Sequence, residues 1–229
     1  MNIAIVPIRK GSKGIKNKNR KILYNKPLFH YSLISLLNAE LIDKVILATD
    51  DDELISSFDY SIFKNSKKLT LYRRLDENAN DESTTESVML EFIELSKLNL
   101  NDNLLLVQAT SPLTTKEDVD NILKDFQTSN YDSILSVIKS PGFYWSSEGF
   151  SLNYDWRKRP RRQEIKNETY KENGALYISK VKNILNSKNR LNGNIGFYIM
   201  KDYQKLDIDN IEDFSKAKEL LISLDKENN

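Results

Sequence analysis

The chain opens with the stretch Asn2-Ile3-Ala4-Ile5-Val6-Pro7-Ile8-Arg9-Lys10-Gly11-Ser12-Lys13-Gly14-Ile15-Lys16-Asn17-Lys18-Asn19-Arg20-Lys21. Its apolar part, residues 2–8, predicts a short buried strand. The loop that follows carries seven cationic side chains, and its two glycines allow the backbone to approach a ligand closely. Amides, a hydroxyl and cations that converge after a strand are suited to binding a polyphosphate. A solvated basic turn would have the same composition, so this stretch alone leaves both interpretations open.

Length and composition limit the possible classes of protein. The chain has 229 residues, with 34 Lys plus Arg against 33 Asp plus Glu, and it has no cysteine. This length is sufficient for one α/β domain with a full core, and the near-neutral charge disfavours a general nucleic-acid binder. The lack of cysteine excludes disulfides, thiolate catalysis and cysteine-based zinc sites. The N-terminal apolar run is too short for a signal peptide or a membrane span, so we expect a cytoplasmic protein that does not associate with a membrane.

Short apolar runs with strand character alternate with segments that have helical spacing. The expected strands are residues 2–8, 44–49, 69–72, 104–107, 133–138, 174–178 and 195–200. This alternation predicts an α/β fold with a parallel, doubly wound sheet. In such a sheet ligands bind at the carboxyl ends of the strands, where the basic loop, Asp50 and Gln108 lie. Asp50-Asp51-Asp52 is suited to capping a short helix, and Thr114-Thr115-Lys116-Glu117 has the pattern of a capping box. Ser179 is expected to cap another short helix.

The pattern changes after Lys139. Residues 141–173 are aromatic, polar and basic, and they have no sustained helical period. We interpret them as a protruding insertion within a single domain that spans residues 1–229. Exposed aromatic side chains of this kind usually mark a contact surface. The basic run of residues 157–162 could instead serve nuclear localisation or nucleic-acid binding, which the near-neutral charge of the chain disfavours.

Seven motifs occur in an order and at spacings that are specific together, although each is short. They are Arg9-x-Gly11-Ser12-Lys13-Gly14 with Lys18-Asn19; Thr49-Asp50-Asp51; Arg74 with Asp81; Gln108-x-Thr110-Ser111-Pro112-Leu113; Arg162-Gln163; Asn173-Gly174-Ala175-Leu176-Tyr177-Ile178; and Asp207-Ile208-Asp209 with Asp213-Phe214. Nearly the whole chain resembles the acylneuraminate cytidylyltransferases, the family of the CMP-sialic acid synthetases and their legionaminic and pseudaminic relatives.

This resemblance implies a reaction, a fold and an assembly. The reaction transfers CMP from CTP to a 2-keto-3-deoxy nonulosonic acid, releases pyrophosphate and supplies an activated sugar for surface glycans. The implied fold is a Rossmann-like, mostly parallel sheet of the nucleotide-diphospho-sugar transferase type, with residues 141–173 as a dimerisation insertion. The implied assembly is a homodimer that uses Mg²⁺ and binds no nucleic acid.

The resemblance also assigns residues to the two substrates. The implied nucleotide contacts are Arg9, Ser12, Lys13, Lys18, Asn19, Arg74 and Thr85. The implied sugar contacts are Gln108, Arg162, Gln163, Asn173 and Tyr177. The cations would neutralise the triphosphate, with Lys13 acting as a catalytic residue. The Asn19 amide would read the cytosine edge, because an amide can donate and accept hydrogen bonds at once.

Asp207 and Asp209 are the expected metal-binding and catalytic pair. Alternate residues of an extended segment point to the same side, and two carboxylates suit Mg²⁺. One of them would also take the proton of the attacking hydroxyl, and the sequence does not say which. Asp209 precedes the last expected helix, so a helix cap is the alternative interpretation.

The sequence departs from the family pattern at three positions. Lys16 stands where a proline is common, and Ala109 and Thr114 replace a proline and an arginine near the sugar site. Sialic, legionaminic and pseudaminic acids share their keto-acid end, so these residues do not distinguish them. A guanylyltransferase for an amino-sugar phosphate and an inactive binding protein of the same fold are the alternatives. Asp207-x-Asp209 with Arg162-Gln163 disfavours the guanylyltransferase. The intact Lys13, Lys18, Asp207 and Asp209 disfavour the inactive binding protein.

Overall fold

A seven-stranded sheet forms the centre of the computed structural model, which describes residues 1–11, 14–80, 82–164 and 168–227. Its strand order is β5-β4-β1-β6-β8-β7-β9, and among these described strands only β8 pairs antiparallel with its neighbours. The strands are β1 (Asn2–Pro7), β4 (Lys44–Thr49), β5 (Leu69–Arg73), β6 (Asn103–Val107), β7 (Ser133–Lys139), β8 (Tyr170–Lys180) and β9 (Ile195–Ile199), with a separate hairpin of β2 (Ile22–Leu23) and β3 (Lys26–Pro27). The predicted mostly parallel sheet is therefore confirmed.

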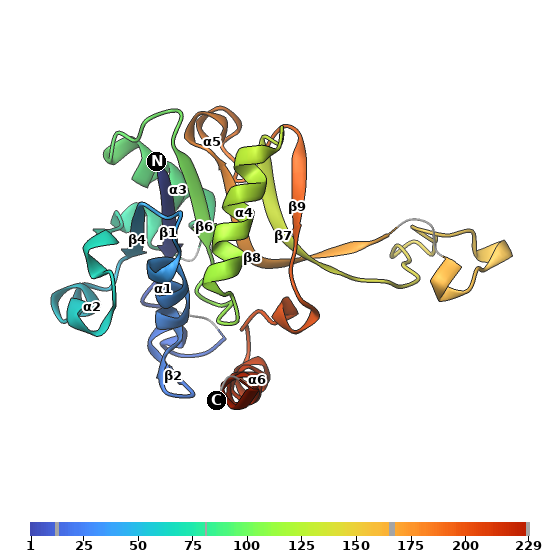
Figure 1. Ribbon diagram of the computed structural model, residues 1–229, viewed down its shortest axis with the longest axis horizontal. Helices are drawn as coiled ribbons and strands as arrows, with labels where there is room; N and C mark the ends of the chain where they lie inside the picture. The colour runs from blue at the N-terminus through green and yellow to red at the C-terminus, as the bar shows by residue number, and fades with distance from the viewer. Residues whose placement is uncertain (12–13, 81, 165–167, 228–229) are drawn as a thin grey trace.

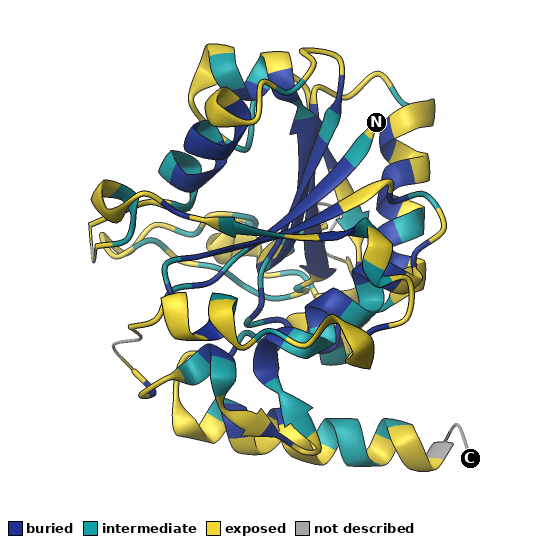
Figure 2. Cartoon of the chain, turned by 90° about the vertical axis from the view of Figure 1, so that its left-hand side faces the viewer, coloured by how far each residue is buried: buried dark blue, intermediate teal, exposed yellow. Residues whose placement is uncertain are grey.

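Helices cover both faces of this sheet. They are α1 (Leu28–Asn38), α2 (Asp52–Ser56), α3 (Thr85–Leu95), α4 (Lys116–Thr128), α5 (Val181–Ser187) and α6 (Ile211–Glu227). Ala4 and Val6 of β1 share a core with α1 and α4, whereas Ile3 and Ile5 share a core with α3 and α5. Alternate side chains of a strand point to opposite faces, so the sheet is doubly wound as predicted. Figure 2 shows the strands as the buried layer between helices with exposed outer faces.

The predicted helix starts have mixed outcomes. Asp51 caps α2 as expected, since its Oδ1 accepts from the Leu54 amide at 3.2 Å. The capping box of α4 lies one residue later than predicted, between Thr115 and Asp118. The prediction for Ser179 is wrong, because this residue belongs to β8 and α5 begins after Lys180.

An arm emerges between β7 and β8 and projects away from the rest of the molecule (Figure 1). The predicted insertion, residues 141–173, overlaps it but also includes the start of β8 at Tyr170. The arm is held internally by aromatic contacts, such as the Arg159 guanidinium 3.9 Å from the ring centre of Phe143. Its exposed large apolar side chains, 47% to 69% accessible, are Trp145, Phe150, Leu152 and Trp156.

Helix α6 packs against the loop that follows β1, at the carboxyl edge of the sheet. Ile15 and Leu23 share a small core with Phe214 and Ala217 of α6 and with Ile208. This core fastens the basic loop to the segment that carries the two predicted metal ligands. No helix within the described ranges has the length and apolarity that crossing a membrane requires.

Candidate active site

A cleft with a volume of about 390 Å³ lies at the carboxyl ends of β1, β5 and β6. Its walls come from the loops after these strands, the start of α3 and the segment before α6. The lining residues are Pro7, Ile8, Arg9, Gly14, Lys18, Asn19, Arg74, Ser83, Thr84, Thr85, Val88, Gln108, Ala109, Thr110 and Asp209. Five predicted nucleotide contacts, namely Arg9, Lys18, Asn19, Arg74 and Thr85, thus share one cleft. The other two, Ser12 and Lys13, lie outside the described residues.

The basic loop touches the segment that carries the metal pair. The Nζ of Lys18 donates to the Ile208 carbonyl at 2.5 Å and lies 3.5 Å from the Oδ1 of Asp209. A side chain at Gly14 would collide with the backbone carbonyl of Asp209. Glycine is therefore required here by the close approach of two backbones. The ion pair between Lys18 and Asp209 places a cation beside a carboxylate at the wall of the cleft.

Asn19 lines the cleft and is held by a hydrogen bond within its own loop. It is buried, and its amide nitrogen lies 3.4 Å from the Arg9 carbonyl. The next residue, Arg20, binds Asp51 at 3.2 Å and Glu53 at 2.9 Å. The sequence predicted only a capping role for Asp51, but its second oxygen anchors the turn that presents Asn19. No sequence signal could reveal this pair, because 31 residues separate its members.

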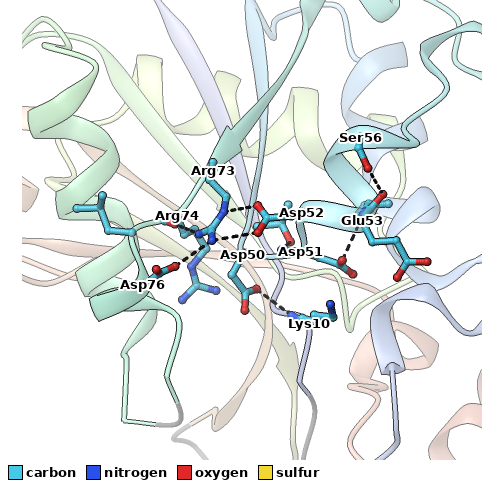
Figure 3. A network of polar contacts seen from close by, with 12 residues as sticks. Lys10, Asp50, Asp51, Asp52, Glu53, Ser56, Arg73, Arg74 and Asp76 are labelled. Carbon is cyan, nitrogen blue, oxygen red and sulfur yellow. Dashed lines mark hydrogen bonds and ion pairs between the residues drawn. The ribbon is translucent and has the colours of Figure 1, made fainter.

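The acidic triplet after β4 fastens the loops on both sides of it (Figure 3). Asp50 accepts a hydrogen bond from the Lys10 amide at 2.8 Å. Asp52 pairs with Arg73 at 2.6 Å, and Arg73 also reaches Asp76 at 2.9 Å. These contacts connect the loop after β1 with the turn after β5. The triplet therefore holds together two segments that line the cleft, the loop after β1 and the turn after β5.

Arg74 is a buried cation that lines the cleft. It is 5% exposed, and its guanidinium donates to the carbonyls of Ile8, at 3.3 Å, and Asn78. Its Nε is buried and has no hydrogen-bond partner among the described residues. Burial lowers the pKa of Arg74, whereas Asp50 and Glu91 oppose this effect. An arginine stays protonated nonetheless, so this group is a charged donor with unused capacity beside the cleft.

Asp207 and Asp209 differ in their surroundings. Asp209 has a 75% exposed side chain, whereas Asp207 is partly buried, and its Oδ1 has no hydrogen-bond partner in the described chain. Burial raises the pKa of Asp207. The hydrogen bond from Thr110 opposes this effect, and the negative charge of Asp209 adds to it. A cation bound between the two carboxylates would relieve this cost.

The alternative interpretation of Asp209 as a helix cap is wrong. Asn210 caps α6, because its Oδ1 accepts from the amides of Glu212 and Asp213 at 2.9 and 3.0 Å. The Asp209 side chain is left for Lys18 and for the cleft. No group of three or more metal-ligating side chains occurs within the described ranges. Two carboxylates nonetheless fit Mg²⁺, which commonly keeps waters and binds substrate phosphates through one or two protein oxygens.

The predicted sugar contacts are dispersed. Gln108 lines the cleft, but Arg162 and Gln163 lie on the arm in a short 3-10 helix, Arg162–Glu164. The Nη2 of Arg162 donates to the Pro141 carbonyl at 2.9 Å. Within the described chain, no arm residue and neither Tyr177 nor Thr114 lines the cleft. One chain therefore brings only Gln108 of this set to the nucleotide residues.

Two of the predicted sugar contacts have hydrogen-bond partners in the body, by which we mean the domain without the arm. The Oδ1 of Asn173 accepts from the Ser136 hydroxyl at 2.6 Å, and its amide nitrogen donates to the Gln204 carbonyl at 3.0 Å. The Tyr177 hydroxyl donates to Glu172. Burial raises the pKa of Tyr177, and the hydrogen bond to Glu172 adds to this effect.

A second network, which is partly buried and which the sequence did not predict, lies beside the start of α3. Arg190 binds Glu86 of α3 through two contacts of 2.5 and 3.0 Å, and its guanidinium lies 4.9 Å from the ring centre of Tyr177. Glu86 follows Thr85, which lines the cleft. The pair spans 104 residues and lies in no local motif, so no signal in the sequence could have indicated it.

The profile of the cytidylyltransferase family matches residues 3–229. The chain belongs to the cytidylyltransferase family. It is 31% identical over 226 residues to an N-acylneuraminate cytidylyltransferase of Escherichia coli, covering 94% of this chain and 51% of that protein. It is 26% identical over 225 residues to a pseudaminic acid cytidylyltransferase of Campylobacter jejuni, covering 95% of this chain and 94% of that protein. The chain thus spans about half the length of the first of these cytidylyltransferases and nearly all of the second.

Solved structures support the fold. A CMP:2-keto-3-deoxy-manno-octonic acid synthetase complexed with CTP superposes with a TM-score of 0.67 at 16% identity, covering 97% of this chain and 99% of the other. A 4-diphosphocytidyl-2C-methyl-D-erythritol synthase superposes with a TM-score of 0.64 at 12% identity, covering 96% and 98%. At these identities the likeness establishes the fold alone.

Proposed function

We propose that this chain transfers CMP from CTP to a nonulosonic acid and releases pyrophosphate. One observation carries the proposal. Arg9, Lys18 and Arg74 line the same cleft as Asp209. The cap of α6 is the next residue, Asn210, so the side chain of Asp209 does not cap the helix. The cleft thus combines cations that would bind a triphosphate with a carboxylate that would bind a metal ion or accept a proton. The names of the relatives, which cover sialic and pseudaminic acids, support the class of sugar.

The reaction replaces a phosphoanhydride bond of CTP with a phosphate ester bond to the sugar acid. The hydroxyl oxygen at the anomeric carbon of the sugar acid attacks the α-phosphorus of CTP. An oxygen–phosphorus bond forms, and the bond to the β-phosphate breaks, so pyrophosphate leaves with the electron pair. Lys18 and Arg74 stabilise the negative charge that develops on the phosphates. The hydroxyl proton passes to an aspartate of the pair or to water, and Asn19 selects cytosine.

Asp207 and Asp209 would hold Mg²⁺. When bound, the ion supplies charge neutralisation at the α-phosphate and orients the attacking group. The Oδ1 of Asp207, which has no hydrogen-bond partner among the described residues, and the exposed carboxylate of Asp209 fit this role. The hydrogen bond from Lys18 to the Ile208 carbonyl does not involve Asp209, so it would keep Lys18 beside the pair when the two carboxylates hold the ion.

A second copy of the chain would complete the sugar end. We propose a two-fold homodimer in which the arm of each protomer reaches the cleft of the other. The exposed Trp145, Phe150 and Trp156 supply apolar area for such an interface. Arg162 would then meet the sugar carboxylate in the partner's cleft, and Gln163 would lie next to it.

The function is tested by measuring pyrophosphate release with each nucleoside triphosphate against a panel of sugar acids. We expect turnover with CTP and a sialic, legionaminic or pseudaminic acid, and chelation of Mg²⁺ should abolish it. Turnover with GTP and an amino-sugar phosphate would assign a guanylyltransferase. Nucleotide binding without turnover on any sugar would assign a binding protein of this fold.

A further inference from the structure

Glu91 is a buried carboxylate on the face of α3 that meets the end of β5. It is 6% exposed, and its hydrogen-bond partners in the described chain come from residues 72–78. Its Oε1 accepts from the Tyr72 hydroxyl at 2.7 Å and from the Leu75 amide at 2.9 Å. Its Oε2 accepts from the Asn78 side-chain nitrogen at 2.6 Å. Burying a carboxylate is costly, and these hydrogen bonds are what offsets that cost.

The segment that Glu91 binds is the one that encloses Arg74. The Asn78 carbonyl accepts from the Arg74 guanidinium, and the Asn78 amide closes a turn on the Leu75 carbonyl at 3.0 Å. On the other side, the Arg74 amide donates to the Thr49 carbonyl at 2.9 Å. Glu91 does not line the cleft, whereas Arg74 does and keeps an Nε without a partner in the described chain. Glu91 therefore has a route to a ligand in the cleft through this turn and Arg74.

We propose that Glu91 is a positioning residue for nucleotide binding: it holds Asn78, and through the Asn78 carbonyl it fixes the Arg74 guanidinium toward the cleft. This inference rests on the proposed function only in taking CTP as the ligand. The geometry has a physical reason. An arginine has many rotamers, and binding is tighter when the protein has already fixed the one that the ligand needs. The negative charge of Glu91 also favours a buried guanidinium nearby.

The first test compares two variants of α3 by calorimetric titration with CTP, with no sugar present. Glu91→Met removes the carboxylate at similar length, and Ile93→Ala removes a buried apolar group from the same helix. Both should lower the melting temperature. Only Glu91→Met should weaken CTP binding, by about tenfold, the factor expected for losing one charge-assisted hydrogen bond. Equal CTP affinity in the two variants would overturn the inference.

The second test exchanges the charge between the two partners. Asn78→Asp places a carboxylate against Glu91 and should weaken CTP binding by about tenfold or more. Adding Glu91→Gln supplies an amide donor to the carboxylate introduced by Asn78→Asp, so the double variant should bind CTP within about threefold of the wild type. In an Arg74→Lys background, Asn78→Asp should have almost no further effect. Failure of the rescue, or additive effects in that background, would show that Glu91 does not act through Arg74.

The outcomes also separate this inference from the proposed function. If the wild type binds CTP but never releases pyrophosphate, the proposed function is contradicted. The role of Glu91 is then still tested by the CTP affinities of Glu91→Met and Ile93→Ala. If turnover is normal and Glu91→Met matches Ile93→Ala, only the positioning role fails. If the wild type binds no CTP, both are contradicted.

Discussion

The two ends of the cleft are built in different ways. At the nucleotide end, Asn19 and Arg74 are each fixed by contacts within the body, through Arg20 with Asp51 and through the turn that Glu91 binds. At the sugar end, Gln108 lines the cleft but Arg162 lies on the projecting arm. One chain therefore brings most of the predicted nucleotide contacts together, but only part of the predicted sugar contacts.

The largest expected effect is at the junction of the two ends. Asp209→Asn should lower kcat by on the order of a hundredfold or more, because a charge that stabilises the transition state is lost. CTP affinity should fall much less. Asp202→Asn is the matched control, since this aspartate pairs with Lys205 on an exposed turn outside the cleft. Near-normal kcat for Asp209→Asn at saturating Mg²⁺ would contradict the metal assignment.

The next effect tests the contact between the basic loop and the metal segment. Gly14→Ala puts a methyl group against the Asp209 carbonyl, so the two backbones must separate. We expect a loss of kcat/KM of roughly ten- to a hundredfold, because a misplacement of about an ångström costs this much. Gly142→Ala, in the arm, is a control, because a Cβ at this position would make only ordinary van der Waals contacts of 3.4 Å or longer with the Tyr144 side chain. Steady-state kinetics that rank the two variants equally would show that the close approach is unimportant.

A smaller effect concerns the choice of base. Asn19→Ala should lower the preference for CTP over UTP by about tenfold, the cost of losing one discriminating hydrogen bond. The dependence of kcat/KM on the sugar acid should not change. Measured with both nucleotides at the same Mg²⁺ concentration, an unaltered preference would remove Asn19 from base recognition.

The fold and the place of the cleft could be predicted because they depend on local patterns, whereas the nucleotide contacts were assigned through the family resemblance. The strands β1, β4 and β6 are covered on both faces and therefore read as continuous apolar runs. Their carboxyl ends meet at one edge, which places Arg9 and Gln108 in one cleft. The reversed direction of β8 could not be predicted in this way, because a buried strand has the same composition in either direction.

The supports of the site could not be predicted, for a related physical reason. Glu91 binds residues 13 to 19 positions away, and Arg190 binds Glu86 across 104 positions. Each of these glutamates lies on a helix surface where a solvated charge would be equally typical. Adjacent residues of the same type are also hard to distinguish in the sequence. Thr114 and Thr115 both fit a helix cap, and only the packed structure shows that Thr115 is the cap.

A last effect concerns the stability of the fold and not the chemistry at either end of the cleft. Burial between Phe29 and Phe63, with the charge of Lys26, lowers the pKa of His30 from 6.5 to about 4. The folded state thus disfavours the protonated form. Stability is complete above pH 6.5, falls as the pH drops from 6.5 to about 4, and changes no further through this group below that.

His30→Leu should remove this part of the pH dependence. The contribution is at most about 3 kcal/mol in the free energy of unfolding. Denaturant unfolding of both proteins between about pH 7 and pH 4 measures it, and the carboxylates that titrate in the same range cancel in the difference. A constant difference between wild type and variant across this range would show that His30 does not resist protonation in the fold.

The difference between the two ends is tested most directly by mixing two inactive proteins. Arg162→Ala damages the arm, and Asp209→Ala damages the body. In a mixed dimer, one cleft has an intact body and receives an intact arm, whereas the other is damaged in both. After subunit exchange has been shown with tagged chains, random mixing in equal amounts should restore roughly a quarter of the sites. Activity that stays at the level of the separate variants would show that Arg162 serves its own chain, which contradicts a sugar site shared between two copies.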